Sequence, residues 1–313
     1  MILRKSCNLI TLCFLMGACL NSALAESGRT QAAVTQEALG QTLSKISQSG
    51  VIYLAHRESS VPFSYVIPES NTPVGYSWEI CQHVVKAVEK KLGKEIQVVP
   101  VNASSFGRMM QVKVNMSDLE CGSTTNTVGR QNMVNFSTTI FVSEVRILVR
   151  ANSGIKTAED LRHKRIVTTS GTNSDRLVKQ FSLQRNVDVV IEAEVSNSDS
   201  MQRLESGDAD AFVNDDAVLL GLRASAKNPE DYVLLDGVSL SVQPYGLVMR
   251  NDDPIFKQLV DDTVIALMRS GEILKIYEKW FNQPIPPNNK SMAFPISDLN
   301  KATFEYPNDR PTN

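Results

Sequence analysis

The chain has 313 residues, of which 32 are Lys or Arg and 34 are Asp or Glu, and its formal net charge is −2 at pH 7. This mildly acidic balance provides no basic field, so it argues against nucleic acid or an anionic membrane surface as the partner. Any anionic ligand must therefore be held by a few locally placed arginines.

The N-terminal residues have the pattern of an export signal. Arg4 and Lys5 form a charged region, residues 9–20 form an apolar stretch, and small residues up to Ala25 form a cleavage site. The apolar stretch is shorter than the roughly 20 residues of a membrane span. Cleavage after Ala25 would leave residues 26–313 as a periplasmic protein, long enough for two lobes. Lipoprotein anchoring at Cys19 is the less favoured alternative.

Five cysteines are present, and three of them, Cys7, Cys13 and Cys19, lie in the predicted signal peptide. The remaining pair, Cys81 and Cys121, predicts a disulfide, because an even pair in an exported protein is most simply bonded. A catalytic Cys121 is the alternative. It would need a histidine partner, and nothing in the sequence places one beside it.

After a short helix that ends at Gly50, apolar runs and amphipathic segments alternate as far as residue 149. Strands are predicted over 51–55, 96–101, 118–121 and 145–149, and helices over 77–92 and 105–111. This β-α-β alternation is typical of a parallel sheet covered by helices.

A second set of alternating units follows, and the chain then returns through residues 245–249 to a long helical region. Helices are predicted over 157–163, 172–182, 199–205, 216–224 and 254–281, and strands over 166–169, 187–193, 210–214 and 232–235. Prolines from Pro284 onward end the helical structure. The polar tail from Asn288 is expected to lie on the surface.

Small hydroxyl residues and an arginine gather in the segment ECGSTTN over 120–126, which is followed by Arg130. Backbone N–H groups, hydroxyls and a guanidinium are the donors that a carboxylate accepts. The alternative is a solvated Ser/Thr loop. Other polar residues also follow predicted strands, namely Arg57, Thr172 and Asp215, and ligands of open α/β sheets bind outside the carboxyl ends of strands.

Several segments together resemble the periplasmic glutamate/aspartate-binding proteins of ABC importers. These are HRESSVPFSY over 56–65, ECGSTTN over 120–126 with Arg130 and Gln131, TSGT over 169–172, LESG over 204–207, NDD over 214–216 and WFNQPIPP over 280–287. The resemblance runs from about Ser44 to the C-terminus. The first two segments are the ones most specific to the branch that binds acidic amino acids.

The resemblance implies an α/β fold of the type II periplasmic-binding-protein class, with a ligand cleft between two lobes. Residues 26–143 and 250–287 would form the first lobe and residues 144–249 the second. Hinge strands are expected near 145–149 and 245–249, and residues 288–313 would form the C-terminal tail.

The resemblance also implies a role for each site residue. Ser123, Thr125 and Arg130 would hold the α-carboxylate of the ligand, and Asp215 would accept from its α-ammonium group. The side-chain carboxylate would be held by Arg57, Ser105 and Arg108, and Thr172 would add a hydroxyl or a backbone donor. Where the family has a histidine, this sequence has Asn197, which can donate a hydrogen bond but carries no positive charge.

The implied function is capture of an acidic amino acid by hinge closure and its delivery to a membrane ABC permease complex. A monomer without cofactor or metal is expected. Two alternatives use the same fold, an amino-acid-sensing binding protein and an exported lyase-type enzyme. Against the enzyme, no Gly-x-Ser-x-Gly elbow, HExxH motif or Cys/His cluster is present in the sequence.

Overall fold

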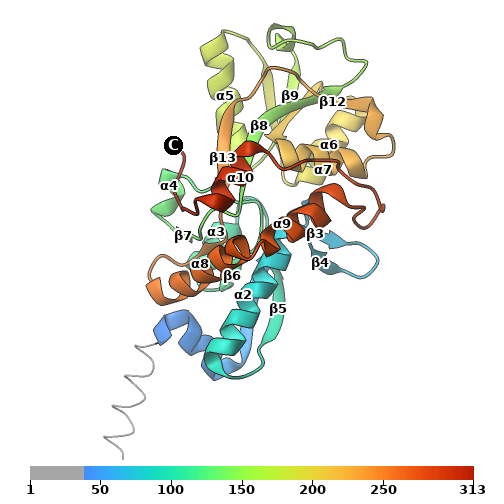
Figure 1. Ribbon diagram of the computed structural model, residues 1–313. Helices are drawn as coiled ribbons and strands as arrows, with labels where there is room; N and C mark the ends of the chain where they lie inside the picture. The colour runs from blue at the N-terminus through green and yellow to red at the C-terminus, as the bar shows by residue number, and fades with distance from the viewer. Residues whose placement is uncertain (1–38) are drawn as a thin grey trace, which may run out of the picture.

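A computed structural model describes residues 39–313 and is shown in Figure 1. The predicted signal peptide and the alternative anchor at Cys19 lie outside the described residues. The described chain begins with a helical segment over residues 39–49 and then builds two sheets, each covered by helices, which form two lobes. The predicted α/β two-lobed fold is confirmed.

The first lobe is built on a five-stranded sheet in the order β5-β1-β6-β14-β7, in which β1 pairs in parallel with β5 and β6. Its strands are β1 (Val51–His56), β5 (Gln97–Asn102), β6 (Leu119–Glu120), β7 (Asn135–Phe136) and β14 (Val248–Met249). A small antiparallel sheet lies beside it, made of β2 (Ser59–Ser60), β3 (Ser64–Ile67) and β4 (Thr72–Val74).

The helices of the first lobe come from both ends of the described chain. They are α2 (Tyr76–Leu92), α3 (Arg108–Lys113), α4 (Val128–Gln131), α8 (Pro254–Arg269), α9 (Glu272–Tyr277) and the π-helical turn Glu278–Asn282. Helix α2 buries Ile80, Val84 and Val88, which recur at helical spacing on one face, and it ends at Gly93 in the left-handed conformation.

The second lobe is built on a sheet in the order β10-β9-β11-β8-β12, with β13 also paired to β8. Its strands are β8 (Phe141–Arg150), β9 (Arg165–Thr169), β10 (Val190–Glu194), β11 (Ala211–Asp215), β12 (Tyr232–Leu234) and β13 (Ser241–Tyr245). Its helices are α5 (Asn173–Arg185), α6 (Asn197–Ser206) and α7 (Asp216–Ser225), with 3-10 turns at Glu159–Leu161 and Pro229–Asp231. The helix predicted over 157–163 is therefore only a single turn.

Strands β8 and β13 form an antiparallel pair between the lobes, in register from Phe141 opposite Tyr245 to Val145 opposite Ser241. The second crossing was predicted over 245–249, and the structure divides that region instead. Strand β13 ends at Tyr245, and β14 already belongs to the first sheet. The chain changes sheets at Gly246, where an added Cβ would lie only 3.0 Å from the carbonyl oxygen of Ser137.

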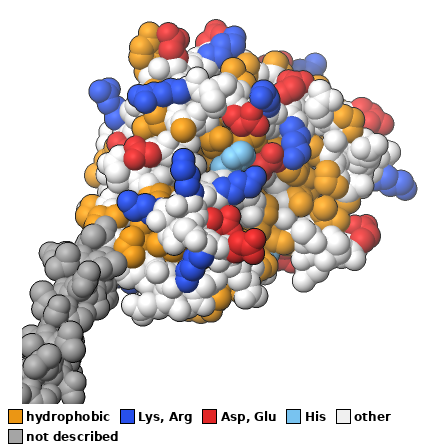
Figure 2. All heavy atoms as spheres, turned by 60° about the horizontal axis from the view of Figure 1, so that its bottom comes forward, with side chains coloured by type: hydrophobic (Ala, Val, Ile, Leu, Met, Phe, Trp, Pro, Cys, Tyr) orange, Lys and Arg blue, Asp and Glu red, His pale blue; other side chains and the backbone are white. Residues whose placement is uncertain are grey.

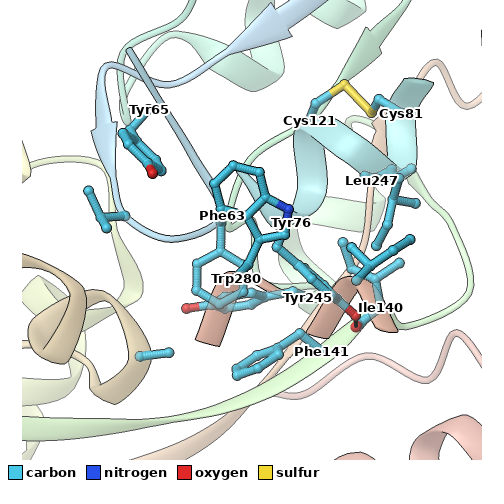
Figure 3. Close-up of a cluster of buried hydrophobic side chains, with 14 of the residues drawn as sticks. Phe63, Tyr65, Tyr76, Cys81, Cys121, Ile140, Phe141, Tyr245, Leu247 and Trp280 are labelled. Carbon is cyan, nitrogen blue, oxygen red and sulfur yellow. Dashed lines mark hydrogen bonds between the residues drawn. A yellow bond between two sulfur atoms is a disulfide. The ribbon is translucent and has the colours of Figure 1, made fainter. Parts of the chain in front are cut away.

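Aromatic side chains form the core where β8 begins and β13 ends, as Figure 3 shows. The rings of Phe63 and Phe141 meet edge to face with centroids 4.8 Å apart, and Phe63 meets Tyr245 at 5.1 Å. The ring of Phe281 stacks on that of Phe141 at 5.1 Å. Phe63 is thus a core residue, which anchors the strand pair to the first lobe.

The predicted disulfide is confirmed. Cys81 of α2 and Cys121, which directly follows β6, are bonded, with their Cα atoms 6.2 Å apart, and the bond is visible in Figure 3. It fixes the beginning of the 121–126 segment to the helix that covers the first sheet.

The C-terminal tail differs from the prediction. It was expected to lie on the surface, but it contains α10 (Asp298–Glu305), whose Asn300 and Phe304 are buried. The side chain of Asn300 accepts from the backbone N–H of Val142 at 2.7 Å and donates to the carbonyl of Val142 at 2.9 Å. Figure 1 shows α10 lying along the strands between the lobes. A few apolar residues spread through a polar segment gave too weak a periodic pattern to predict this packing.

On the face shown in Figure 2, Lys and Arg side chains are interspersed with Asp and Glu. This face therefore presents no field of a single sign. Within residues 39–313, no helix has the length and apolar character needed to cross a bilayer.

Candidate functional site

One cavity between the lobes is lined by all nine residues predicted to form the site. They are Arg57, Ser105, Arg108, Ser123, Thr125, Arg130, Thr172, Asn197 and Asp215. Two further residues, Asn173 and Asn214, complete the lining. A larger hollow of about 360 Å³ lies between α5 and the last residues of the chain, but it is lined by none of the predicted residues.

Arg57 enters the cavity from the end of β1. Its backbone N–H donates to the hydroxyl of Ser64 at 2.9 Å, its Nε donates to the carbonyl of Ala103 at 2.8 Å, and its Nη2 donates to the hydroxyl of Ser105. Burial, together with the nearby positive charge of Arg108, lowers the pKa of Arg57 to about 9. The guanidinium remains charged at neutral pH and is held in one orientation.

Arg108 is 2 % exposed and is positioned by a relay from a buried carboxylate. Its Nε donates to the hydroxyl of Thr124 at 2.6 Å, and that hydroxyl donates to Oε2 of Glu120 at 2.8 Å. Burial lowers the pKa of Arg108, while the charge of Glu120 raises it. Glu120 and Thr124 therefore orient the arginine from behind.

Arg130 lies in the short helix α4, which follows the 120–126 segment. The hydroxyl of Thr127 accepts from the backbone N–H of Arg130 at 3.2 Å and so caps the helix. The side chain of Arg130 donates to the carbonyls of Thr125 at 2.9 Å and of Gly171, in the second lobe, at 3.2 Å. Burial and the charge of Arg108 lower its pKa to about 9. Ser123, from the same loop, also faces the cavity.

Asp215 stands on the second lobe at the point where β11 meets α7. Its Oδ2 accepts a hydrogen bond from the hydroxyl of Tyr245, whereas its buried Oδ1 has no hydrogen-bond partner among residues 39–313. Burial raises the pKa of Asp215 to about 7, and the bond from Tyr245 opposes this rise. An unpaired carboxylate oxygen in a cavity with three arginines suits a ligand that also carries a positive group.

Thr172 occupies the N-cap position of α5, next to Asn173. Its hydroxyl donates to the carbonyl of Thr169 at 2.6 Å, so the hydroxyl already has one protein partner. The amide of Asn173 donates to the side chain of Gln243 in β13 at 2.8 Å.

Asn197 begins α6 and is buried between the lobes. Its Nδ2 donates to the hydroxyl of Ser60 in the first lobe at 3.2 Å, and its Oδ1 accepts from the side chain of Asn214 at 3.0 Å. A neutral amide is suited to this place because it can both donate and accept. Asn197 thus joins the lobes as well as lining the cavity.

Sequence reasoning missed Asn173, Asn214, Glu120 and Thr124 as members of the site. All four lie within or directly beside motifs that had been singled out, and that adjacency was the available signal. Glu120 changes the charge balance, because it is fully buried behind the arginines. Three arginines and two carboxylates, Asp215 and Glu120, leave the site with a formal charge of +1.

The part of the chain that the structure describes has no group of three or more His, Cys, Asp or Glu side chains placed to hold a metal ion. What the cavity offers is hydrogen-bond donors, three positive charges and one free carboxylate oxygen. This arrangement fits a small zwitterion that carries excess negative charge.

Two of the curated proteins that match this chain are described here. The glutamate/aspartate import solute-binding protein of Escherichia coli (strain K12) is 44% identical over 288 residues, which cover 92% of this chain and 95% of that protein. The L-glutamate/L-aspartate-binding protein of Pseudomonas aeruginosa is 41% identical over 280 residues, which cover 89% and 92% of the two chains.

Among solved structures, the fold is similar to that of the ancestral amino acid-binding protein AncCDT-1, described as a precursor of cyclohexadienyl dehydratase. The identity is 25%, the TM-score is 0.66, and the match covers 77% of this chain and 100% of that one. The family model for bacterial extracellular solute-binding proteins, family 3, matches residues 52–283. This chain therefore belongs to the family 3 bacterial extracellular solute-binding proteins.

Proposed function

We propose that this protein binds glutamate or aspartate between its lobes, closes around the amino acid and delivers it to an ABC permease. The observation that carries the proposal is the composition of the cavity: two buried arginines, Arg57 and Arg108, and the half-buried Arg130 face a buried carboxylate, one oxygen of which has no hydrogen-bond partner among residues 39–313. The relatives named above, which are import and binding proteins for these amino acids, support it over most of the chain length.

In this proposal, Arg130 binds the α-carboxylate of the ligand, with Ser123 and Thr125 beside it. Asp215 accepts from the α-ammonium group through its free Oδ1. Both assignments follow the chemistry of the groups, because a guanidinium pairs with a carboxylate in a fork and a carboxylate pairs with an ammonium ion.

Arg57 and Arg108, with Ser105, bind the side-chain carboxylate, and Thr172 contributes a donor at the start of α5. Asn197 stands where the family has a histidine and supports the closed cleft through Ser60. The formal charge of +1 on the site matches the net charge of −1 on glutamate or aspartate. Such matching matters, because taking an unpaired ion out of water costs several kcal/mol.

Binding is coupled to movement of the lobes about β8 and β13, since the proposed ligand contacts come from both lobes. A ligand that interacts with both lobes favours the closed state by the free energy of the contacts made only there. Closed protein then docks, as a monomer, on the permease. Export to the periplasm by the N-terminal signal brings it to that partner.

An enzyme on this fold is the second candidate, because one similar structure is described as a precursor of a dehydratase. The named curated relatives are binding proteins and not enzymes, so we favour binding without turnover. A sensing role would use the same cleft and differs only in the partner that reads the closed state.

Calorimetric titration of the protein with glutamate, aspartate, glutamine and asparagine tests the proposal. Glutamate and aspartate should bind more tightly than their amides, and the bound amino acid should be recovered unchanged by mass spectrometry. Absence of binding would refute the ligand assignment, and conversion of the ligand would favour the enzyme.

A further inference from the structure

We infer that two glycines of the second lobe, Gly171 and Gly221, set how far the cleft can close. The backbone of the first lobe packs directly against both, so that even a methyl group there would hold the lobes apart. The inference rests on the proposed function, since it concerns closure around the amino acid.

Gly171 lies directly before Thr172, at the edge of the cavity. A Cβ atom built on it would lie 2.6 Å from the Cα of Phe106, 2.7 Å from the backbone nitrogen of Phe106 and 2.9 Å from the carbonyl carbon of Ser105. These atoms belong to the first lobe and are backbone, so no change of side-chain rotamer relieves the clash. Its carbonyl accepts from Arg130, another first-lobe residue, at 3.2 Å. The backbone of Ser105 and Phe106 and the side chain of Arg130, all of the first lobe, therefore meet the second lobe at Gly171.

Gly221 lies within helix α7 and forms the second meeting point. A Cβ atom built on it would lie 2.3 Å from the carbonyl oxygen of Val61 and 2.7 Å from the carbonyl carbon of that residue. Glycine is less favourable than alanine inside a helix, so the glycine does not stabilise the helix itself. Close packing against the first lobe gives a physical reason for a glycine here.

Other contacts place the segment that meets Gly221 in the interface between the lobes. The hydroxyl of Ser60, next to Val61, accepts from Asn197, and the hydroxyl of Ser59 accepts from the backbone N–H of Ser198 at 3.4 Å. Separation of the lobes removes the neighbours of both glycines. A methyl group at either position therefore disfavours the closed state alone.

The matched control is Gly154, also in the second lobe. It has the same positive φ of 76° as Gly171, but a Cβ atom built on it meets no atom of the described chain, residues 39–313, within 4 Å. Gly154→Ala therefore carries the cost of a side chain in a left-handed conformation without any contact between the lobes.

The test measures glutamate affinity by calorimetry and ligand-free stability by urea unfolding, for the wild-type protein and the three alanine variants. Gly171→Ala and Gly221→Ala should each weaken glutamate binding at least tenfold, whereas Gly154→Ala should stay within twofold of wild type. Without ligand, Gly221→Ala should be at least as stable as wild type, and Gly171→Ala should lose no more stability than Gly154→Ala.

Affinities within twofold of wild type for both interface variants would overturn the inference. So would weakened binding accompanied by a loss of ligand-free stability beyond that of Gly154→Ala, because the clash would then lie within one lobe. If the wild-type protein itself binds no glutamate, the proposed function fails as well. Failure of the inference alone is recognised by normal wild-type binding with unaffected variants.

Discussion

The hydroxyl of Tyr245 donates a hydrogen bond to Oδ2 of Asp215. Tyr245 ends β13, one of the two strands between the lobes, and Asp215 ends β11 at the cavity. The bond therefore links the strand pair directly to the carboxylate that faces the proposed ligand ammonium. It also opposes the effect of burial, which raises the pKa of Asp215 to about 7.

Replacement of Tyr245 by phenylalanine should raise the pKa of Asp215 further, because the ionised form loses a donor. Less of the carboxyl is then charged at neutral pH, and glutamate affinity should fall at least tenfold, in keeping with roughly 1.5–3 kcal/mol for a hydrogen bond to a charged group. The loss should be larger at pH 6 than at pH 8 in calorimetric titrations. Tyr277→Phe, which removes a hydroxyl bonded to the carbonyl of Phe294, is the control. A loss of affinity independent of pH would contradict this account.

The raised pKa of Asp215 should also make the stability of the ligand-free protein depend on pH. The pKa is about 7 when folded against 3.8 for the unperturbed group, so the folded protein binds more protons between these values. The protonation of Asp215 therefore stabilises the folded protein fully below about pH 4, and this stabilisation is lost as the pH rises through about 7. Asp215→Asn should therefore gain stability relative to wild type between pH 5 and pH 8, by an amount of order a few kcal/mol. Urea unfolding at several pH values measures this, with the exposed Asp262→Asn as control, and parallel curves for Asp215→Asn and wild type would refute it.

The disulfide should make a large contribution to stability. The bonded cysteines are separated by 40 residues, and the chain-entropy relation values such a loop at about 4 kcal/mol. The double variant Cys81→Ser, Cys121→Ser should show a matching decrease in the free energy of unfolding. Glutamate affinity should fall too, because Cys121 begins the segment that carries Ser123 and Thr125. An unchanged intact mass on reduction of the wild-type protein would show that the bond does not form.

Replacement of Arg130 by alanine should strongly weaken the binding of all four amino acids tested. The guanidinium is proposed to bind the α-carboxylate, which every amino acid carries, and loss of one partner of a buried charge pair costs about 2–5 kcal/mol. Calorimetry should show at least a thirtyfold loss for glutamate, aspartate, glutamine and asparagine alike. The surface variant Arg185→Ala serves as control. A loss confined to the two acids would assign Arg130 to the side chain of the ligand instead.

Much of the fold follows from local patterns in the sequence. The alternation of apolar runs and amphipathic segments predicts both sheets, and the polar residues after β1, β6 and β9, with Asp215 at the end of β11, predict where the cavity lies. These features are set by near neighbours in the chain and by the rule that parallel strands point their ends to one edge. The role of each residue in the site was predicted from the family resemblance and not from local patterns.

The remaining features depend on contacts between distant segments. Asn300 forms a hydrogen bond with Val142, which lies 158 positions away in the chain, and the composition of the tail does not predict this contact. The place of Glu120 behind Arg108 depends on how β6 and α3 pack together. Just after β13 ends at Tyr245, Gly246 approaches the backbone of Ser137 closely, and only the assembled sheets create this contact.

The central claim is that Arg57 and its neighbours recognise the acidic side chain of the ligand within a closed cavity. The most direct measurement is the ratio of glutamate to glutamine affinity, determined by calorimetry for the wild-type protein and for Arg57→Ala. The account predicts that wild type binds glutamate much more tightly than glutamine and that the ratio falls at least tenfold in the variant. Equal affinities in wild type, or a ratio unchanged by the substitution, would contradict it.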